Sequence, residues 1–271
     1  MRLVSRLIPA LAVVIIMFAG AAPLHADLNL IDMFRNVEYN QTSGAAPAVP
    51  SFYFVNLEAG MANPGDFTSV TVSYPGPGSP DTLTLESSTE FGEGVSFATL
   101  SDMNAAYPTG TYTFSASGGS SPAEMASLAY ALDAFTSDIP ALTASTFAAL
   151  QGMNPADPFT FNFNSFTMNP DASFGNTYLT VFGSSYTTGA LPNTATSAVM
   201  PGGTLLPDTT YTYELDFIDR ITGVDPLNGV PTEIGFDVRT DGTFTTAPEP
   251  STMIPLALAF VGVSAGRLRR A

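Results

Sequence analysis

Residues 205–217 read Leu-Leu-Pro-Asp-Thr-Thr-Tyr-Thr-Tyr-Glu-Leu-Asp-Phe, a turn followed by an alternating run. From Tyr211 to Phe217 an aromatic or apolar residue occupies every second position, with Thr and acidic residues between them. Successive side chains of a strand point to opposite faces, so this run predicts a β-strand with one buried face and one polar face.

The same alternation recurs along the chain. Clusters of Gly, Pro, Ser, Thr, Asn and Asp separate the alternating runs, which is typical of an all-β sandwich protein. Residues 124–135 fit a strand or a helical stripe, and we favour a strand because a turn and the strand-like run 110–114 precede them. Thr143 is expected to cap a short helix that Gly152 ends. Further alternating runs lie at residues 69–74, 83–85, 158–163 and 233–239.

The turn before Tyr211 resembles the one that precedes strand F in fibronectin type III domains. Leu205, Pro207, Thr209 and Tyr211 fit the pattern Leu-x-Pro-x-Thr-x-Tyr. The resemblance implies a structural tyrosine corner, in which the Tyr211 hydroxyl bonds back to the turn, and a core position for Leu205.

A similar but shorter motif, residues 108–114, contains Tyr112, which lies 99 residues before Tyr211. That spacing is close to the length of one sandwich domain, so Tyr112 is expected to form a second tyrosine corner. We therefore predict two tandem β-sandwiches of immunoglobulin or fibronectin III type, at residues 27–137 and 138–247. Different geometry in the two tyrosine turns would contradict this internal repeat.

Residues 1–26 have the layout of a secretory signal peptide. Two Arg precede an apolar run, and a site suited to cleavage between Ala26 and Asp27 follows. The segment is therefore expected to be a helix that is removed on export, the alternative being an uncleaved membrane anchor. Cleavage would also remove His25, the only His of the chain.

Residues 248–271 combine three features in a fixed order. Pro248-Glu249-Pro250 is followed by an apolar stretch, which we expect to form a transmembrane helix, and then by a basic tail. The tail is expected on the cytoplasmic side, which leaves the body outside. Three arginines supply its charge: Arg267, Arg269 and Arg270.

This order resembles the PEP-CTERM sorting signal of exported bacterial proteins in organisms that make exopolysaccharide. The resemblance covers only about the last 24 residues. It implies processing near Pro248 by an exosortase-type enzyme of the inner membrane. The alternative is a permanent single-pass anchor.

The composition excludes several classes of chemistry. The chain has no Cys, no Lys and no Trp, so thiolate nucleophiles, disulfides and Schiff-base lysines are absent. The body from 27 to 247 has no His, which excludes a Ser–His–Asp triad and an imidazole metal site. It carries 3 Arg against 23 acidic residues, a net charge of −20 that would repel nucleic acid.

Calcium suits an acidic extracellular β-protein, because hard cations prefer carboxylate and carbonyl oxygens. The candidate ligands lie between Asp216 and Asn228, but the segment lacks the spacing of known calcium loops. The alternative, which we favour, is that these side chains are solvated acids on strand faces. The candidates are Asp216, Asp219, Asp225 and Asn228.

The sequence also offers candidate residues for a sugar-binding surface and for a glycosidase site. Sugar stacking could use four tyrosines, although most rings of such a fold belong to its core. A glycosidase would need two opposed carboxylates, and pairs such as Glu90 and Glu93 are expected by coincidence among 24 acids. The tyrosines are Tyr53, Tyr107, Tyr178 and Tyr186.

The sequence therefore predicts an exported bacterial protein of the cell surface or extracellular matrix, anchored in the inner membrane only during sorting. We expect a non-catalytic structural or adhesive component, with exopolysaccharide as a candidate partner. A glycan- or calcium-binding module is the alternative, and a glycoside hydrolase using only carboxylates is a weaker one. No catalytic residue, metal ligand or cofactor is expected, apart from the calcium considered above.

Overall fold

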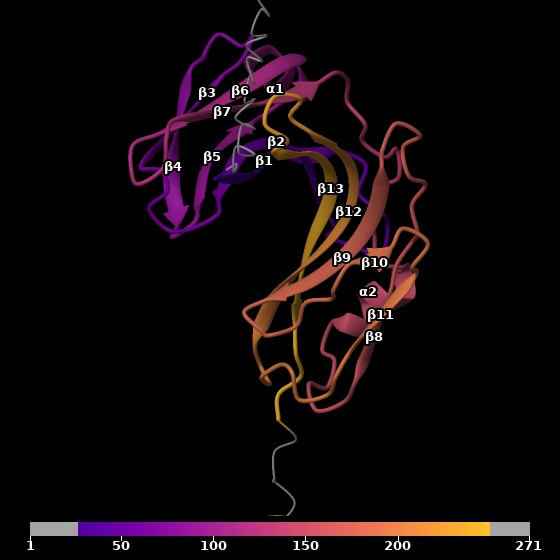
Figure 1. Ribbon diagram of the computed structural model, residues 1–271. Helices are drawn as coiled ribbons and strands as arrows, with labels where there is room; N and C mark the ends of the chain where they lie inside the picture. Colours follow the sequence, from indigo (N-terminus) through magenta and orange to yellow (C-terminus); the bar gives the residue numbers. More distant parts are fainter. Residues whose placement is uncertain (1–26, 250–271) are drawn as a thin grey trace, which may run out of the picture.

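The computed structural model describes residues 27–249, and β-strands dominate it (Figure 1). The prediction of a mainly β fold is confirmed. The first half contains β1 (Leu28–Asn40), β2 (Pro50–Met61), β3 (Ser69–Ser73), β4 (Asp81–Ser87), β5 (Glu90–Phe97), α1 (Leu100–Ala106), β6 (Gly110–Ser117) and β7 (Glu124–Tyr130). The second contains α2 (Ala144–Leu150), β8 (Phe159–Asn162), β9 (Phe174–Phe182), β10 (Leu191–Pro192), β11 (Ser197–Met200), β12 (Thr210–Val224) and β13 (Pro231–Thr245).

Eleven strands form one sheet in the order β10-β9-β12-β13-β1-β2-β5-β4-β3-β6-β7. The pairing of β1 with β13 is parallel, and all the other pairings are antiparallel. Strands β12 and β13 have 15 residues each, which corresponds to about 50 Å of extended chain. They run as long curved strands between two lobes (Figure 1).

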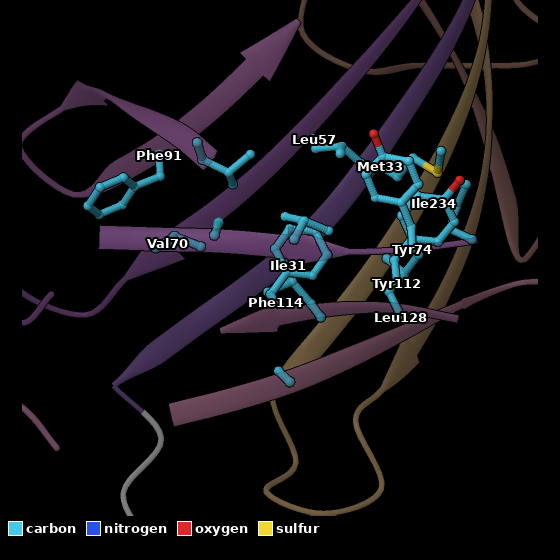
Figure 2. Packing of buried hydrophobic residues seen from close by; sticks show 14 of the residues in the cluster. Ile31, Met33, Leu57, Val70, Tyr74, Phe91, Tyr112, Phe114, Leu128 and Ile234 are labelled. Atoms are coloured by element: carbon cyan, nitrogen blue, oxygen red, sulfur yellow. The ribbon is translucent and has the colours of Figure 1, made fainter. Parts of the chain in front are cut away.

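Each lobe has its own apolar core. In the first lobe the sheet curls until β7 lies near β1 and β13, and side chains from these strands meet in one cluster (Figure 2). In the second lobe, the two-stranded sheet of β8 and β11 and the helix α2 enclose a core with β9 and β12. Buried Leu205 belongs to that second core, as the fibronectin resemblance implied.

The tandem arrangement of two sandwiches needs correction. The first core contains residues from before the expected boundary at 137/138, but also Val230, just before β13, and Ile234 and Phe236 of β13. The second core contains only residues from after that boundary. The sheet itself crosses the boundary, because β1 pairs with β13 from Ile31 opposite Thr232 to Asn40 opposite Asp241. The lobes therefore share their central strands. The reason is the length of β12 and β13, which exceeds what one core can cover.

Local predictions hold for two segments. Residues 124–130 form a strand, and α2 is capped by Thr143, whose side chain accepts a hydrogen bond from the Thr146 N–H. Gly152 lies just beyond α2 with a φ of +74°, which favours glycine. Sequence reasoning missed α1, a seven-residue helix capped by Thr99.

The ends of the chain lie mostly outside the described residues. The predicted signal-peptide helix, Ala26, Pro250 and the transmembrane helix with Arg267, Arg269 and Arg270 all fall there. Within residues 27–249, no helix is long and apolar enough to cross a membrane.

Candidate functional site: the polar face of the central sheet

The neighbouring strands β12, β13, β1 and β2 carry charged side chains on the face of the sheet opposite to the two cores. On β1, Ile31 and Met33 point into the first core, so Asp32 points to the other side. The strand register places Glu58 of β2 and Glu233 of β13 directly beside Asp32. We call this surface the polar face. It comprises Asp32, Phe34, Asn36, Glu38, Asn56, Glu58, Glu214, Asp216, Arg220, Glu233, Asp237, Arg239 and Asp241.

Like charges crowd around Asp32, which is only 4% exposed. Burial, followed by the nearby carboxylates of Glu58, Glu233 and Glu90, raises the pKa of Asp32 to about 8. Burial and the neighbouring Glu90 raise the pKa of Glu58 to about 7. Arg220, which pairs with Glu233, only partly offsets these effects. The carboxyl groups of Asp32 and Glu58 therefore retain protons near neutral pH.

A second group of carboxyls surrounds Arg239. Its guanidinium lies 2.6 Å from Asp237 Oδ2, 3.1 Å from Glu214 Oε2 and 3.6 Å from Asp216 Oδ1. Burial still raises the pKa of all three carboxyls, although Arg239 opposes it. A single guanidinium therefore forms ion pairs with three carboxyl groups.

Two rings lie over glycines of the polar face. A side chain at Gly235 would collide with the ring of Phe34, and one at Gly94 would collide with the ring of Phe54. The guanidinium of Arg220 stacks on Phe34, with 5.3 Å between its Cζ atom and the ring centroid. The glycines therefore let these rings lie against the sheet.

A cleft of about 790 Å³ opens at the end of the polar face, between the end of β1, α2 and the strands β12 and β13. Its wall is held in place by Gln41, whose side chain bonds to the backbone of Leu142 and to the Tyr213 hydroxyl. The lining is mainly amide and hydroxyl groups, one carboxyl and one ring: Asn40, Gln41, Thr42, Phe147, Gln151, Thr212, Asp241, Gly242 and Thr243.

The structure does not bring the candidate calcium ligands together. Asp216 and Asp219 point to opposite faces of β12 because they are three residues apart. Asp225 accepts hydrogen bonds from three backbone N–H groups, and Asn228 donates to Glu124 and Met125. Across residues 27–249, no cluster of three acidic side chains has a geometry suited to a metal ion.

The tyrosines proposed for sugar stacking are dispersed. Tyr107 is buried and stacks on Tyr74 with ring centroids 5.0 Å apart. Tyr53 packs against the first core and Tyr186 against the second. Half-buried Tyr178 lies on β9 opposite Asp216 of β12.

The acidic pair proposed for catalysis is not opposed across a cleft. Glu90 and Glu93 are three residues apart on β5 and point to opposite faces of that strand. Glu90 lies beside Glu58 on the polar face, and Glu93 pairs with Leu57, which points into the first core.

The two structural tyrosines contact their turns in opposite ways. The Tyr112 hydroxyl donates to the Pro108 carbonyl at 2.9 Å, whereas the Tyr211 hydroxyl accepts from the Leu206 N–H at 2.9 Å. The left-handed residue is Asp208 in the second turn, with φ +49°, directly after its proline. In the first turn it is Gly110, two residues after its proline. The predicted internal repeat is therefore wrong in its turn geometry.

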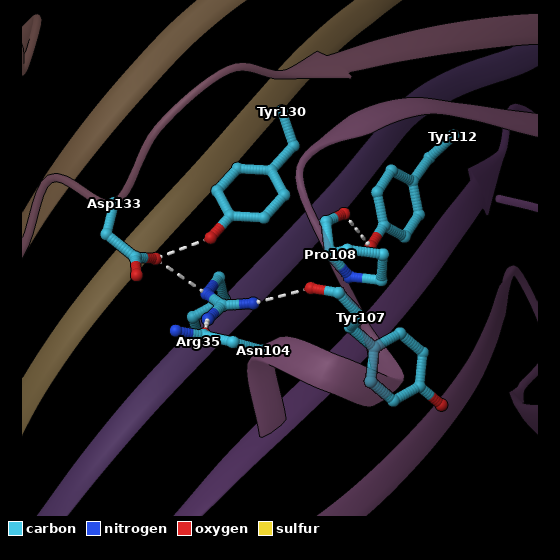
Figure 3. Close-up of polar contacts among 7 residues, drawn as sticks. All are labelled: Arg35, Asn104, Tyr107, Pro108, Tyr112, Tyr130 and Asp133. Atoms are coloured by element: carbon cyan, nitrogen blue, oxygen red, sulfur yellow. Dashed lines mark hydrogen bonds and ion pairs between the residues drawn. The ribbon is translucent and has the colours of Figure 1, made fainter. Parts of the chain in front are cut away.

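Sequence reasoning missed the role of Arg35, which is fully buried in the first lobe (Figure 3). Its guanidinium donates to the Tyr107 carbonyl at 3.1 Å and to Asn104 Oδ1, and pairs with Asp133 at 3.0 Å. It also lies over the Tyr130 ring, 4.8 Å from the centroid. The sequence signal that could have revealed it is the alternation of β1, in which Arg35 follows the core residues Ile31 and Met33 at every second position.

Comparisons with known proteins give no family. No protein-family model matches the chain, and no curated protein matches it. A Ca²⁺-stabilized adhesin that helps an Antarctic bacterium bind ice shares 18% identity over 82% of this chain and 50% of its own, with a TM-score of 0.25. A 1.5-MDa bacterial ice-binding adhesin gives 18% identity, 82% and 66% coverage and a TM-score of 0.23.

The FN1-FN3 domains of chicken CNTN1 give 12% identity, 76% and 67% coverage and a TM-score of 0.24. The chain thus spans between half and two thirds of the length of the two adhesin structures. At these scores the likeness assigns no function.

Proposed function

We propose that this is an exported bacterial protein sorted by a PEP-CTERM signal and processed by an exosortase-type enzyme. Its body is a non-catalytic structural or adhesive component of the cell surface or extracellular matrix, associated with exopolysaccharide. The observation that carries the proposal is that the Pro-Glu-Pro motif begins where the hydrogen-bonded fold ends.

Among residues 27–249, the last one tethered by a backbone hydrogen bond is Ala247, whose N–H donates to the Met153 carbonyl at 2.8 Å. Thr246 before it bonds to Thr209 and Leu206, whereas Pro248 and Glu249 are exposed. Figure 1 places this end of β13 at the far end of the second lobe. A processing enzyme could therefore cut beyond Ala247 without opening a strand.

A structural role is supported by the way in which β13 is held. It pairs with β12 on one side and with β1 on the other. Because β1 and β13 are parallel neighbours, pulling the start of β1 against the end of β13 strains their hydrogen bonds together rather than one at a time. Such a ladder suits a body anchored at one end.

Mass spectrometry of the protein from its native host tests the sorting. We expect a first residue of Asp27 and a C-terminus near Pro248 without the basic tail. Glu249→Ala should leave the tail in place, whereas Asp171→Ala, at an exposed acid remote from the motif, should not. An intact tail on the wild-type protein would refute the processing.

Glycan binding is a second candidate function, and the cleft at the end of the polar face favours it. Its amides and hydroxyls match the hydrogen-bonding groups of sugars, and half-buried Phe147 offers a ring. Asp241 and the acidic body would disfavour uronic acids. The expected ligand is therefore a neutral oligosaccharide.

Calorimetry of the processed protein with cellobiose, maltose and digalacturonate tests this candidate. Binding of a neutral disaccharide that is lost in Phe147→Ala and weakened in Thr243→Val would support it. The matched variants Phe182→Ala and Thr245→Val alter exposed residues outside the cleft and should bind normally. No heat with either neutral sugar, or binding only of the acidic one, would refute it.

A further inference from the structure

The curled sheet of the first lobe has a seam where β7 lies close to β1 and to the hairpin of β12 and β13. Strand β7 shares no hydrogen-bonded ladder with these three strands. Side chains close the seam instead. Asp225 Oδ2 accepts from the Ser127 N–H at 2.7 Å, and Asn228 Nδ2 donates to the Met125 carbonyl at 2.9 Å.

Glu124, at the start of β7, holds the beginning of the described chain to this seam. Its Oε2 accepts from the backbone nitrogens of Asp27 and Leu28, each at 3.0 Å. Asn228 Nδ2 donates to the other carboxylate oxygen at 2.9 Å, which fixes the carboxylate from the opposite side. The Asp27 carbonyl in turn accepts from the Ala62 N–H at 2.8 Å.

We propose that Glu124 is the binding site for the α-ammonium group of the mature protein, which docks there once the signal peptide has been removed. This inference rests on the proposed export and on cleavage before Asp27. Hydrolysis breaks the amide bond between Ala26 and Asp27: the hydroxyl of water goes to the Ala26 carbonyl carbon and its other proton to the Asp27 nitrogen. At neutral pH the new carboxylic acid of Ala26 releases its proton and the new amine takes one up. A neutral amide donor thereby becomes a primary amine that is charged at neutral pH.

The change strengthens a contact that is already formed. Hydrogen bonds between an ammonium group and a carboxylate are stronger than those from a neutral donor. Arg35 pairs with Asp133, Arg220 pairs with Glu233, and Arg239 pairs with the three acids described above. Within the described residues, no Arg pairs with Glu124. Arg35 lies at the other end of β7, against Tyr130 and Asp133, so the new amine would be the cation at the Glu124 end. The exported form would therefore close more tightly at that end than the precursor.

The absence of Lys makes this contact directly measurable, because the α-amine is then the only primary amine of the mature protein. The rate of its acylation by acetic anhydride, followed against pH, gives its pKa. An ordinary α-amine has a pKa of about 7.7–8.0, and a carboxylate partner raises it. At pH 7 we expect acylation of the wild-type protein to be at least about threefold slower than that of Glu124→Gln. This difference corresponds to an α-amine pKa that is about half a unit higher in the wild-type protein.

Glu124→Gln keeps an oxygen that can accept the hydrogen bonds but removes the charge. Glu90→Gln, a carboxyl outside the seam, is the matched control and should acylate at the wild-type rate. Equal rates for wild type and Glu124→Gln, with Asp27 at the N-terminus, would overturn the docking site and leave the export proposal intact. A first residue other than Asp27 would overturn it as well, whereas a retained Arg-rich tail would refute the sorting alone.

Discussion

Arg35 and Asp32 lie three residues apart on β1 and face opposite sides of the sheet. Both are shielded from solvent, with 0% and 4% of their surface exposed. Arg35 meets a carbonyl, an amide oxygen and a carboxylate, whereas Asp32 meets two further carboxyls and keeps Oδ1 without a hydrogen-bond donor among the described residues. Burial alone therefore does not decide whether a charge persists, since the partners decide it.

Removing the Arg35 side chain should have the largest effect. Arg35→Met fills similar space but leaves the Tyr107 carbonyl and Asn104 Oδ1 without their donor. We expect the free energy of unfolding to fall by about 3–5 kcal/mol, because the charged guanidinium donates two hydrogen bonds and each such bond is worth about 1.5–3 kcal/mol. Urea denaturation followed by circular dichroism measures this loss.

Arg220→Met is the matched control on the polar face. Its side chain is 21% exposed, pairs with Glu233 and stacks on Phe34, so we expect a smaller loss of about 1–2 kcal/mol. If the two substitutions cost the same, the buried network around Arg35 does not hold the first lobe together.

Changing the pH should have the next largest effect, through Asp32. Its pKa is about 8 in the folded protein against an ordinary 3.8, so the folded state binds the proton more tightly than the unfolded state. The resulting stability is fully present below about pH 4 and is lost as the pH rises through about 8. Between pH 5 and pH 8 we expect a loss on the order of 3 kcal/mol, measured by urea denaturation at each pH.

A pair of Asp→Asn substitutions isolates this effect. Asp32→Asn resembles the protonated acid, so it should remove the part of the loss that Asp32 contributes and change little at pH 5. Glu58, whose pKa is raised to about 7, keeps its own part of the loss. Burial alone would raise the pKa of Asp225, but N–H donors from Asn228, Ser127 and Leu227 hold it below its ordinary value. Asp225→Asn should therefore cost about 2 kcal/mol at both pH values. A wild-type stability that rises between pH 5 and pH 8 would contradict this account of Asp32.

The alternating runs sufficed to predict seven strands, and Thr143 with Gly152 sufficed for α2, because these signals are local. The strands predicted in this way are β3, β4, β6, β7, β8, β12 and β13, whereas β1, β2, β5, β9, β10 and β11 were not identified. The path of the sheet was not predictable in the same way. Whether β13 pairs with β1 depends on contacts between residues some 200 positions apart, for which an alternating pattern carries no information. Tyr112 and Tyr211 share short motifs, yet their turns differ because the left-handed position falls on different residues.

The polar face was hidden for a related reason. Its acids are dispersed along the sequence and read as solvated outer positions of separate strands. Only the strand register places Glu233, Asp32 and Glu58 side by side. Likewise, the acid that holds the Asp27 nitrogen comes from a strand that begins 97 residues later.

The smallest effects should come from the two tyrosine hydroxyls, which set the scale for losing one neutral hydrogen bond on the same core face as Arg35. Tyr112→Phe leaves the half-buried Pro108 carbonyl without its donor and should cost about 1 kcal/mol. Tyr211→Phe frees the N–H of exposed Leu206, which water can reach, so its cost should be about 0.5 kcal/mol. Both rings keep their packing in the variants, so urea denaturation reports the hydroxyl alone. A larger loss for Tyr211→Phe than for Tyr112→Phe would mean that access to water does not determine the cost of an unmade hydrogen bond in this fold.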